Sequence, residues 1–526
     1  MPDIGSPAGP AERARKVCVI GAGISGLVAA KVLLGRGHGV TVVEKSGDLG
    51  GVWEPARSYP GVRTQTPRDL YCFSDFPMPA GYPEWPTGGQ MHAYLDAYAA
   101  RFGLRPHIRF RTEVRSVSRR ADGGGRGWSV ALHGAGGETE TEHYDFVVVA
   151  TGQFSRPRAL PLPGADAFRA AGGSIRHSSE HVDRERARGR DVVVVGFSKS
   201  ATDLAMDALA EGARSVTLVY RRATWKIPHF FGGVVNFKRI LYCRASEAMF
   251  TPWAPSRAGR LARRLLAPAI RANWRALEAL LDVQFGLRKA GLRPATRIED
   301  GIHCATGIET PGFYKAVREG RIRAVKGEVT GYEPGRVVVD AATKVDTDLV
   351  VLAIGWSQDL PFLDEDAQRL LIEPDGQYRL HRWTVNPDLP DLGFVGFNSS
   401  FASALSAELG AHWLARWLDG ALARPPTDAG MRAEIERTLD WKRRRRVAAA
   451  GYGGLCVAPF HHAHFDELMA DMGARSRRGN ALAAYLAPID PEAYAELLET
   501  APDRGGAART RAEARGVELA RKTTPI

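Results

Sequence analysis

The stretch from Val17 to Gly26 reads V-C-V-I-G-A-G-I-S-G. Four apolar residues lead into a glycine-rich turn, and apolar residues then recur at helical spacing from Leu27 to Leu34. The order of strand, tight turn and helix is the context in which the pattern G-x-G-x-x-G indicates a dinucleotide-binding unit. The sequence therefore predicts a Rossmann-like α/β domain at the start of the chain.

Each glycine of this pattern has a physical role. Gly21 permits the tight turn, Gly23 lets the backbone approach a pyrophosphate, and Gly26 lets the helix pack closely on the strand. The helix N-terminus offers unpaired N–H groups and a partial positive charge to the phosphates. A second strand, Val40 to Val43, ends at Glu44, about twenty residues after the glycines, where a ribose-binding acid is expected. We therefore predict that Glu44 accepts hydrogen bonds from an adenosine ribose.

Length and composition limit the classes of protein to consider. A chain of 526 residues is too long for one core, so two or three domains are expected. Its 44% hydrophobic and 25% charged residues are ordinary for a soluble globular protein. The net charge of +12 is spread over several regions, which favours attraction of anionic cofactors over binding of nucleic acid.

The cysteines and the N-terminus indicate the compartment. Five cysteines without a C-x-x-C pair give no support to a dithiol mechanism and suggest a reducing environment. Residues 1–15 have no apolar core, so we interpret them as a disordered leader and not as a secretory signal. No apolar run approaches the roughly 18 residues that span a bilayer, and we expect a cytoplasmic protein. No pair among the fourteen histidines has a spacing typical of metal ligands, so no metal is predicted.

The segment after Glu44 contains a second pair of glycines. Gly50 and Gly51 would let the backbone approach a flat ring system, and Trp53 would form its wall. Taken alone, this stretch is explained better as an ordinary loop with a buried tryptophan.

A stretch rich in proline and aromatic residues follows, from Tyr59 to Pro79. Such a stretch can line a pocket, with Thr64, Gln65 and Thr66 as polar groups. A long packed surface loop is the alternative.

Further elements complete the first part of the chain. An amphipathic helix is predicted over 90–102, with short strands at 108–110 and 128–132 and a hairpin turn over 122–127. The sequence Y-D-F-V-V-V-A-T-G over 144–152 predicts a buried strand that ends in a small turn at Ala150, Thr151 and Gly152. The prolines between Arg156 and Gly164 exclude helix and sheet interior, so we interpret 156–164 as a linker that leaves the first domain.

The opening theme recurs at 191–205, D-V-V-V-V-G-F-S-K-S-A-T-D-L-A. Gly196 begins the turn, Ser198 replaces the second glycine and must turn away or bind a phosphate oxygen, and Ala201 fills the third, small position. The next strand, 216–220, ends in Arg221 and Arg222 instead of an acid. Arginine at this position fits a 2′-phosphate and indicates NADPH over NADH; two surface arginines are the weaker alternative.

The remainder of the chain is less regular. The arginine-rich region 235–294 is predicted to be largely helical, with Leu261, Leu265 and Leu266 at helical spacing. It could lie on a membrane surface, although helices that cover the second domain or form a lid are favoured. We expect a small sheet over 322–339, a buried strand over 348–356 that returns the chain to the first domain, a strand-turn at 392–396, a helix over 407–418, and a basic tail.

With both nucleotide motifs in place, the sequence resembles the flavin-containing monooxygenases, class B flavoproteins that are related to Baeyer–Villiger monooxygenases. The matching pieces, which together span most of residues 16–420, are G-A-G-I-S-G with Glu44, G-G-V-W at 50–53, S-D-F-P-M-P at 74–79, A-T-G at 150–152, G-F-S-K-S-A at 196–201, R-R-A-T-W at 221–225, L-G-F-V-G at 392–396 and A-E-L at 407–409. Two features depart from the family. The identifying stretch F-x-G-x-x-x-H-x-x-x-(W/Y/F) has lost both aromatic ends at 171–181, and Gln65 stands where many members place an asparagine near the flavin.

The resemblance implies a fold of two Rossmann-like domains, one for FAD and one for NADPH, with an additional helical region. We expect residues 16–160 and 346–440 to form the FAD-binding domain, 161–345 the NADPH-binding domain with a helical insertion at 235–294, and 441–526 a basic, partly helical tail. The implied cofactor contacts include Ser200 and Gly396 besides the residues discussed above, and Gln65 is the expected partner of the oxygenated flavin.

The implied reaction is NADPH-dependent reduction of FAD, formation of a flavin C4a-(hydro)peroxide with O2, and transfer of one oxygen atom to a small organic substrate, at nitrogen or sulfur. Baeyer–Villiger insertion beside a ketone, an uncoupled NADPH oxidase and a non-enzymatic flavoprotein remain alternatives. The sequence leaves the substrate and a homodimer open.

Overall fold

The computed structural model describes residues 14–120, 126–253, 255–301, 307–398, 400–444, 457, 460–474 and 481–500. The predicted leader, residues 1–15, lies almost entirely outside this part of the chain. Residues 121–125, which include most of the predicted turn at 122–127, also lie outside it. Among the described residues, no helix has both the length and the apolar character needed to cross a membrane.

The first sheet confirms the predicted Rossmann-like unit. Its five parallel strands are arranged β22-β7-β1-β2-β3, and they span Leu392–Phe394, Phe146–Val149, Lys16–Ile20, Gly39–Val43 and Ile108–Arg109. Side chains alternate across the sheet. Val17 and Val19 of β1 pack with α1 (Ile24–Gly35) and α11 (Ser403–Leu418), whereas Cys18 and Ile20 face the other side. That side is covered by an antiparallel sheet of β4 (Glu113–Arg119), β5 (Trp128–His133) and β6 (Thr139–Tyr144).

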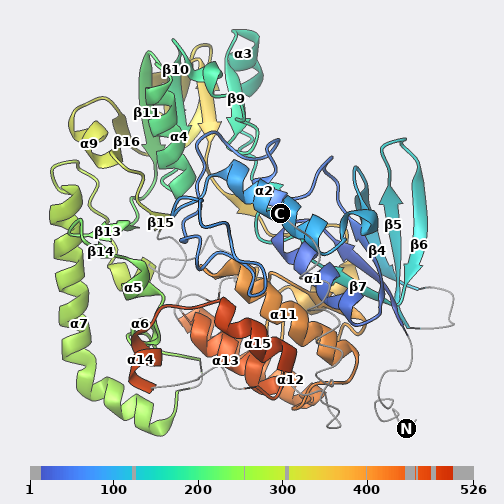
Figure 1. Cartoon of the computed structure of the whole chain (residues 1–526). Coiled ribbons are helices and arrows are strands. Elements are labelled where there is room, and N and C mark those ends of the chain that lie inside the picture. The colour runs from blue at the N-terminus through green and yellow to red at the C-terminus, as the bar shows by residue number, and fades with distance from the viewer. Residues whose placement is uncertain are drawn as a thin grey trace.

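The second sheet repeats the same three layers. Its parallel strands are arranged β16-β11-β10-β20-β9, and they span Arg323–Lys326, Ser215–Tyr220, Asp191–Val195, Leu349–Leu352 and Ser174–His177. Val192 and Val194 belong to the core that contains α4 (Lys199–Ala210). Val193 and Val195 pack with the antiparallel sheet β17-β18-β19, which spans Val329–Glu333, Arg336–Val339 and Thr343–Asp346, and with Phe168 of α3 (Ala165–Ala170). In Figure 1 the second unit forms the upper part of the molecule and the first unit lies toward the right.

Two expectations about this region are wrong. The strand within 348–356, expected to return the chain to the first domain, is β20, and it pairs with β10 and β9 inside the second sheet. The first strand expected in the small sheet, β16, pairs instead with β11 at the edge of the second parallel sheet. The chain crosses between the units where β8 (Arg156–Pro157) in the predicted linker pairs with β21 (Trp356–Ser357), so the outgoing and returning segments bind each other.

The region 235–294 is helical over much of its length. It begins in the hairpin of β13 (Phe230–Phe231) and β14 (Val235–Asn236) and continues through α5 (Lys238–Leu241), α6 (Arg244–Glu247) and the long α7 (Arg257–Phe285). After α8 (Ile298–Gly301), β15 (Gly307–Ile308) pairs with β12 (Lys226–Ile227). The C-terminal helices span Asp428–Arg444 (α12), His461–Asp471 (α13), Ala481–Leu486 (α14) and Glu492–Thr500 (α15), and α13 packs on α11. The other α-helices of the described residues are α2 (Gly88–Arg101), α9 (Phe313–Arg318) and α10 (Glu365–Leu371).

Candidate functional site: two glycine cradles and the contact between them

The first glycine turn lies where β1 meets α1. Gly21 has a φ of +105°, a conformation that side chains disfavour, and a Cβ on Gly26 would overlap the carbonyl oxygen of Gly21. Gly23 is the N-cap of α1, and no side chain caps this helix or places an acid in its first turn. The N–H groups at the start of α1 are therefore available for an anion, as a pyrophosphate site requires.

A second turn packs against the first. The N–H of Gly50 donates to the carbonyl of Ala22 at 2.9 Å, and a Cβ on Gly51 would lie 3.2 Å from the Cα of Gly23. Both glycines have positive φ angles. Trp53, at the end of this turn, is buried and meets Tyr71 edge to face with ring centroids 6.0 Å apart. The G-G-V-W stretch is thus part of the first cradle, although the structure by itself assigns no ligand to the indole ring.

Glu44 lies at the carboxyl end of β2, as predicted, and is buried. Its Oε2 accepts from the N–H of Ala22 at 2.8 Å, and its Oε1 accepts from the N–H of Ser46 at 2.9 Å. These bonds fix the carboxylate beside the glycine turn. Each carboxylate oxygen has further acceptor capacity, so the geometry fits a carboxylate that also accepts from ribose hydroxyl groups.

The remaining predicted residues of this cradle close around the same turn. A Cβ on Gly21 would lie 3.0 Å from the carbonyl oxygen of Ala150, and a Cβ on Gly396 would overlap the side chain of Ser25 in the first turn of α1. Gly152 has a φ of +64°. The hydroxyl oxygens of Thr64 and Thr151 are buried without a hydrogen-bond partner among the described residues. Unpaired buried hydroxyls are unfavourable, so an elongated ligand with polar groups, such as a flavin dinucleotide, fits the cradle.

The second cradle, where β10 meets α4, has the same form with one difference. Gly196 has a φ of +131°, and a Cβ there would overlap the carbonyl oxygen of Ala353. Ser198 is the N-cap of α4, and its Oγ accepts from the N–H of Ala201 at 3.3 Å and lies 2.9 Å from the Oγ of Ser200. Ser198 therefore caps its own helix and leaves fewer free N–H groups than Gly23 does.

The two arginines follow β11 at the edge of this cradle. Arg221 and Arg222 are exposed, and Arg221 makes an ion pair with Glu328 at 3.3 Å. An exposed pair of this kind is weak, so a phosphate dianion can replace the glutamate. Both arginines directly follow the last residue of β11, Tyr220.

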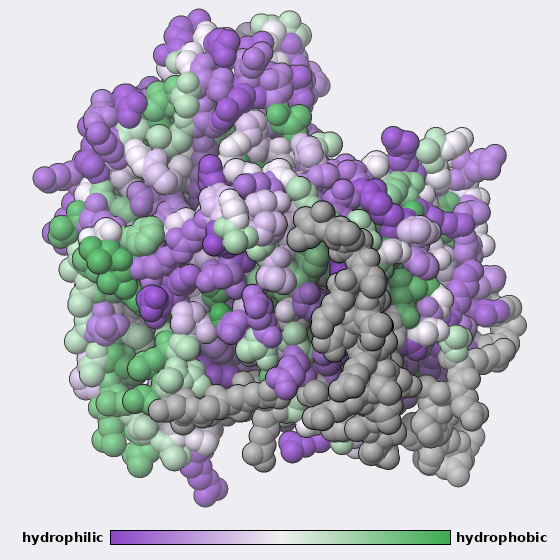
Figure 2. Space-filling view, in the orientation of Figure 1, coloured by the Kyte–Doolittle hydropathy of each residue, from purple (hydrophilic) through white to green (hydrophobic). Residues whose placement is uncertain are grey.

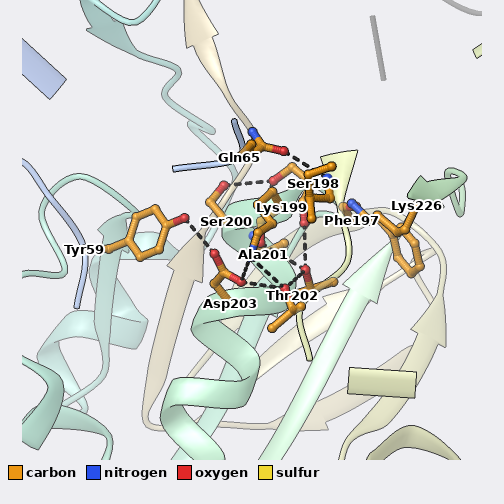
Figure 3. A network of polar contacts seen from close by, with 12 residues as sticks. Tyr59, Gln65, Phe197, Ser198, Lys199, Ser200, Ala201, Thr202, Asp203 and Lys226 are labelled. Carbon is orange, nitrogen blue, oxygen red and sulfur yellow. Dashed lines mark hydrogen bonds and ion pairs between the residues drawn. The ribbon is translucent and has the colours of Figure 1, made fainter. Parts of the chain in front are cut away.

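A polar network joins the second cradle to the segment that follows the first cradle, as Figure 3 shows. Asp203 of α4, whose side chain is 10% exposed, makes an ion pair with Lys199 and accepts from the Tyr59 hydroxyl at 3.0 Å and the Thr310 hydroxyl at 2.5 Å. Burial and the adjacent carboxylate raise the pKa of Tyr59, which keeps its phenol protonated as a donor. Sequence reasoning did not identify Asp203, Lys199 or Thr310; the only available signal was the i, i+4 spacing of Lys199 and Asp203.

Gln65 lies at the same contact. Its Oε1 accepts from the N–H of Ile308 at 3.0 Å, which leaves its amide NH2 group to face another partner. A Cβ on Gly307 would lie 3.2 Å from Gln65 Oε1 and 3.7 Å from the Nζ of Lys226. Because Gly307 has no side chain, space remains between Gln65, which is predicted to face the flavin, and the amine of Lys226.

Lys226 is 2% exposed, and its Nζ donates to the carbonyl of Phe197 at 2.8 Å. Burial, reinforced by the positive charge of Lys199 and opposed by Asp203, lowers the pKa of Lys226 to about 7. Nothing in the stretch R-R-A-T-W-K indicates that this lysine is buried.

An apolar pocket adjoins this junction. Its lining comes from β12, the helical insertion, β15, the segment before α11, and α13. It comprises Ile227, Phe237, Leu241, Tyr242, Ser246, Phe250, Gly307, Ile308, Phe401 and His461. Among the described residues that line the pocket, none is a carboxylate, a lysine or an arginine. His461 is 1% exposed, its pKa is lowered to about 3 mainly by burial, and its Nδ1 has no partner among the described residues. The segment expected to be only a basic tail therefore contributes to the pocket.

The buried state of Lys226 makes a testable prediction about stability. The unfolded amine binds its proton up to about pH 10.5, whereas the folded amine loses it near pH 7. The unfolded state therefore binds more protons between these values, and the folded protein gains stability as pH rises, by up to about 1.4 kcal/mol per pH unit. Lys226→Met removes this pH dependence. The free energy of unfolding of the variant minus that of the wild type should therefore decrease from pH 7 to pH 10, as measured by urea unfolding.

The matched control is Lys344→Met, because Lys344 is an exposed lysine in β19. Its difference from the wild type is expected to stay constant with pH. If the Lys226→Met difference also stays constant, Lys226 is not buried as an amine with a lowered pKa.

Comparison with known proteins bears on what these cradles hold. Residues 14–475 match the model of the family described as flavin-binding monooxygenase-like. A probable flavin-containing monooxygenase 1 of Arabidopsis thaliana is 31% identical over 91% of this chain and 96% of its own length, and a mouse (Mus musculus) dimethylaniline monooxygenase (N-oxide-forming) 2 is 28% identical over 88% and 83%. The structure of an oxidized steroid monooxygenase bound to NADP is 21% identical, aligns with a TM-score of 0.66 over 87% of this chain and 97% of that one, and shows the shared fold.

Both predicted nucleotide-binding units thus lie within the matched region, and the family uses FAD and NADPH. The chain belongs to the flavin-binding monooxygenase-like family, whose members are flavin-dependent oxidoreductases.

Proposed function

We propose that the cradle at β1 and α1 holds FAD, that the cradle at β10 and α4 holds NADPH, and that the protein transfers one oxygen atom from O2 to the nitrogen or sulfur of a small apolar substrate. The observation that carries this proposal is the junction at Gly307. There Gln65 of the first unit, α4 of the second and the apolar pocket meet. The bound flavin supplies the redox and oxygen chemistry.

The side chains have binding and positioning roles. Glu44 would accept from the ribose, the first turn of α1 would bind the pyrophosphate of FAD, and Arg221 with Arg222 would bind the 2′-phosphate of NADPH. The ion pair of Asp203 with Lys199 and the hydroxyl of Tyr59 would hold the second cradle against the first. Gln65, fixed by the N–H of Ile308, would present its amide NH2 to the flavin.

The pocket supports a neutral substrate with a large apolar part. Burying a charged group without a partner is costly, and the lining offers no opposite charge to a carboxylate or an ammonium group. The unpaired Nδ1 of His461 offers one hydrogen bond to a polar atom of the substrate. The name of the mouse relative, an N-oxide-forming monooxygenase, supports oxygenation at nitrogen.

Baeyer–Villiger oxygen insertion is the second candidate. The fold resemblance to cyclohexanone monooxygenase, with a TM-score of 0.65, keeps this reaction open. Supplying a cyclic ketone and an aryl methyl sulfide to the same enzyme separates the two, because only Baeyer–Villiger chemistry converts the ketone to a lactone.

The role of Gln65 gives the test of the proposed reaction. Gln65→Leu keeps the approximate size of the side chain but removes its amide, so we expect a larger fraction of the consumed NADPH to appear as hydrogen peroxide and a smaller fraction as sulfoxide. The measurement compares peroxide, sulfoxide and NADPH consumed, with an aryl methyl sulfide as the neutral probe. Gln65→Asn, which keeps the amide, is expected to retain more of the coupling.

The outcome that contradicts the proposal is equal coupling in the wild type and Gln65→Leu. Sulfoxide formation by neither protein, with NADPH still consumed, would favour the uncoupled oxidase.

The placement of FAD predicts the effect of a single methyl group. A Cβ on Gly23 would lie 3.6 Å from the nearest protein atom, which is ordinary contact, so Gly23→Ala should fold. The same methyl group points to the expected pyrophosphate position, and we expect FAD affinity to fall by roughly tenfold or more, which corresponds to about 1.4 kcal/mol. Flavin absorbance relative to protein after dialysis measures this loss.

Gly35→Ala is the control, because a Cβ at this position of α1 meets nothing within 4 Å. It should retain its flavin. Full flavin retention by Gly23→Ala would place the pyrophosphate elsewhere.

The arginines predict the choice of nucleotide. Arg221→Ala removes a charged hydrogen bond to the 2′-phosphate, so the Michaelis constant for NADPH should rise about tenfold or more while that for NADH changes little. The control is Arg336→Ala in β18, which also removes one member of an exposed ion pair at 3.3 Å. Equal changes for the two nucleotides would exclude the phosphate role.

A further inference from the structure

The long helix α7 presents an apolar face to solvent. Its buried residues are Trp274, Glu278, Leu281 and Phe285, all in its C-terminal half. In the N-terminal half, Leu261, Leu265 and Leu266 are 60%, 73% and 56% exposed. Figure 1 places this half at the lower left of the molecule, and Figure 2 shows apolar residues gathered there.

Leu261 and Leu265 belong to one continuous stripe, and Leu266 lies at its edge. Residues three and four positions apart share a helix face, and the outward face carries apolar or small residues along the helix: Ala258, Leu261, Ala262, Leu265, Ala269, Ala272, Ala276, Leu280 and Val283. The opposite face is the one that packs on the protein. A helix that only covered a domain would turn its apolar stripe inward, so the lid or cover expected from the sequence does not explain this arrangement.

Arginines line one flank of the stripe. Residues 257–273 contain five arginines and no aspartate or glutamate. Arg263 faces the protein and donates to the carbonyls of Ala248 and Met249 at 2.7 and 2.8 Å. The other four, at 257, 260, 264 and 271, are exposed and project on the same side of the helix.

The short helix α14 contributes further exposed leucines at the same corner of the molecule. In α14, Leu482 and Leu486 are 67% and 55% exposed. This helix contacts α6, and the segment directly after α6 is the one that Arg263 of α7 binds. We refer to Leu261, Leu265, Leu266, Leu482 and Leu486, with the exposed arginines of α7, as the basic apolar patch.

We propose that the basic apolar patch binds the surface of a membrane that contains anionic phospholipids. An apolar stripe flanked by arginines matches a bilayer interface, where leucines enter the acyl boundary and guanidinium groups reach the phosphates. A second copy of the chain fits less well. The exposed flank of α7 between 257 and 273 offers no carboxylate, and an antiparallel pairing of two such helices would place their arginine rows side by side.

Five arginines in seventeen residues make a transmembrane course for this helix unfavourable, so it lies along the surface. Pro268 lies inside α7, and Figure 1 shows that this helix is bent. Trp274 of α7 packs on Phe250 of the apolar pocket, with ring centroids 5.2 Å apart. The patch and the pocket are therefore built on the same helical insertion.

The test is flotation of the full-length flavin-loaded protein with vesicles. We expect the protein to float with vesicles of equal parts phosphatidylcholine and phosphatidylglycerol, to float much less with phosphatidylcholine alone, and to be released by high salt. Leu261→Ser/Leu265→Ser/Leu266→Ser should weaken binding about tenfold or more. Arg260→Gln/Arg264→Gln should weaken it roughly thirtyfold at low salt.

All the changed side chains are exposed, so flavin content and NADPH oxidation in solution should remain as in the wild type. Leu370→Ser is the matched control, because Leu370 is an exposed leucine, 40% accessible, on α10. The proposal is overturned if the wild type does not float with anionic vesicles, or if the triple leucine variant floats as the wild type does. A wild-type dimer that the leucine variant converts to a monomer would instead assign the patch to a second copy.

Discussion

The position of the two cradles relative to each other depends on the carboxylate of Asp203, whose side chain is 10% exposed. A carboxylate removed from water is unfavourable unless it is paired and hydrogen-bonded. Asp203 is paired with Lys199 on its own helix, but its hydrogen bonds come from Tyr59, in the segment after the first cradle, and Thr310, which follows β15. Three distant parts of the chain must therefore come together for the charge to be satisfied, and together they bring Gln65 and the apolar pocket to the same place.

The two units also share one structural solution. Each has a parallel sheet with helices on one face and a three-stranded antiparallel sheet on the other, and each requires glycine where a Cβ would meet a backbone carbonyl oxygen. This backbone requirement explains why the sequence predicts so much of the fold. Gly21 and Gly196 are visible in the sequence because no other residue fits their turns, and Glu44 is visible because strand length and helix length fix its distance from the glycines.

What the sequence could not predict depends on contacts between distant segments. The stretch D-L-V-V-L-A-I-G describes a buried strand equally well in either sheet, so its pattern could not assign β20 to the second one. Lys226 has the residue type of an exposed position, and only tertiary packing places it at 2% exposure. His461 is separated from Gln65 by almost four hundred residues and reaches the pocket because α13 packs on α11. The exposure of Leu265 also requires the structure, since helical spacing shows that a stripe exists but not which way it faces.

The two helix N-termini differ in a way that separates the tasks of the cradles. The start of α4 is capped by the Ser198 side chain, which stabilises a helix by about 1 kcal/mol without any ligand. The start of α1 has glycine as its N-cap and no side-chain cap. Its unpaired N–H groups therefore gain more from an anion than those of α4, and a pyrophosphate held there would become part of the fold of the first unit. The second cradle depends less on its nucleotide, because Ser198 Oγ accepts from one N–H group of α4 and Arg221 is paired with Glu328. This asymmetry suits one cofactor that stays bound and another that enters and leaves in each catalytic cycle.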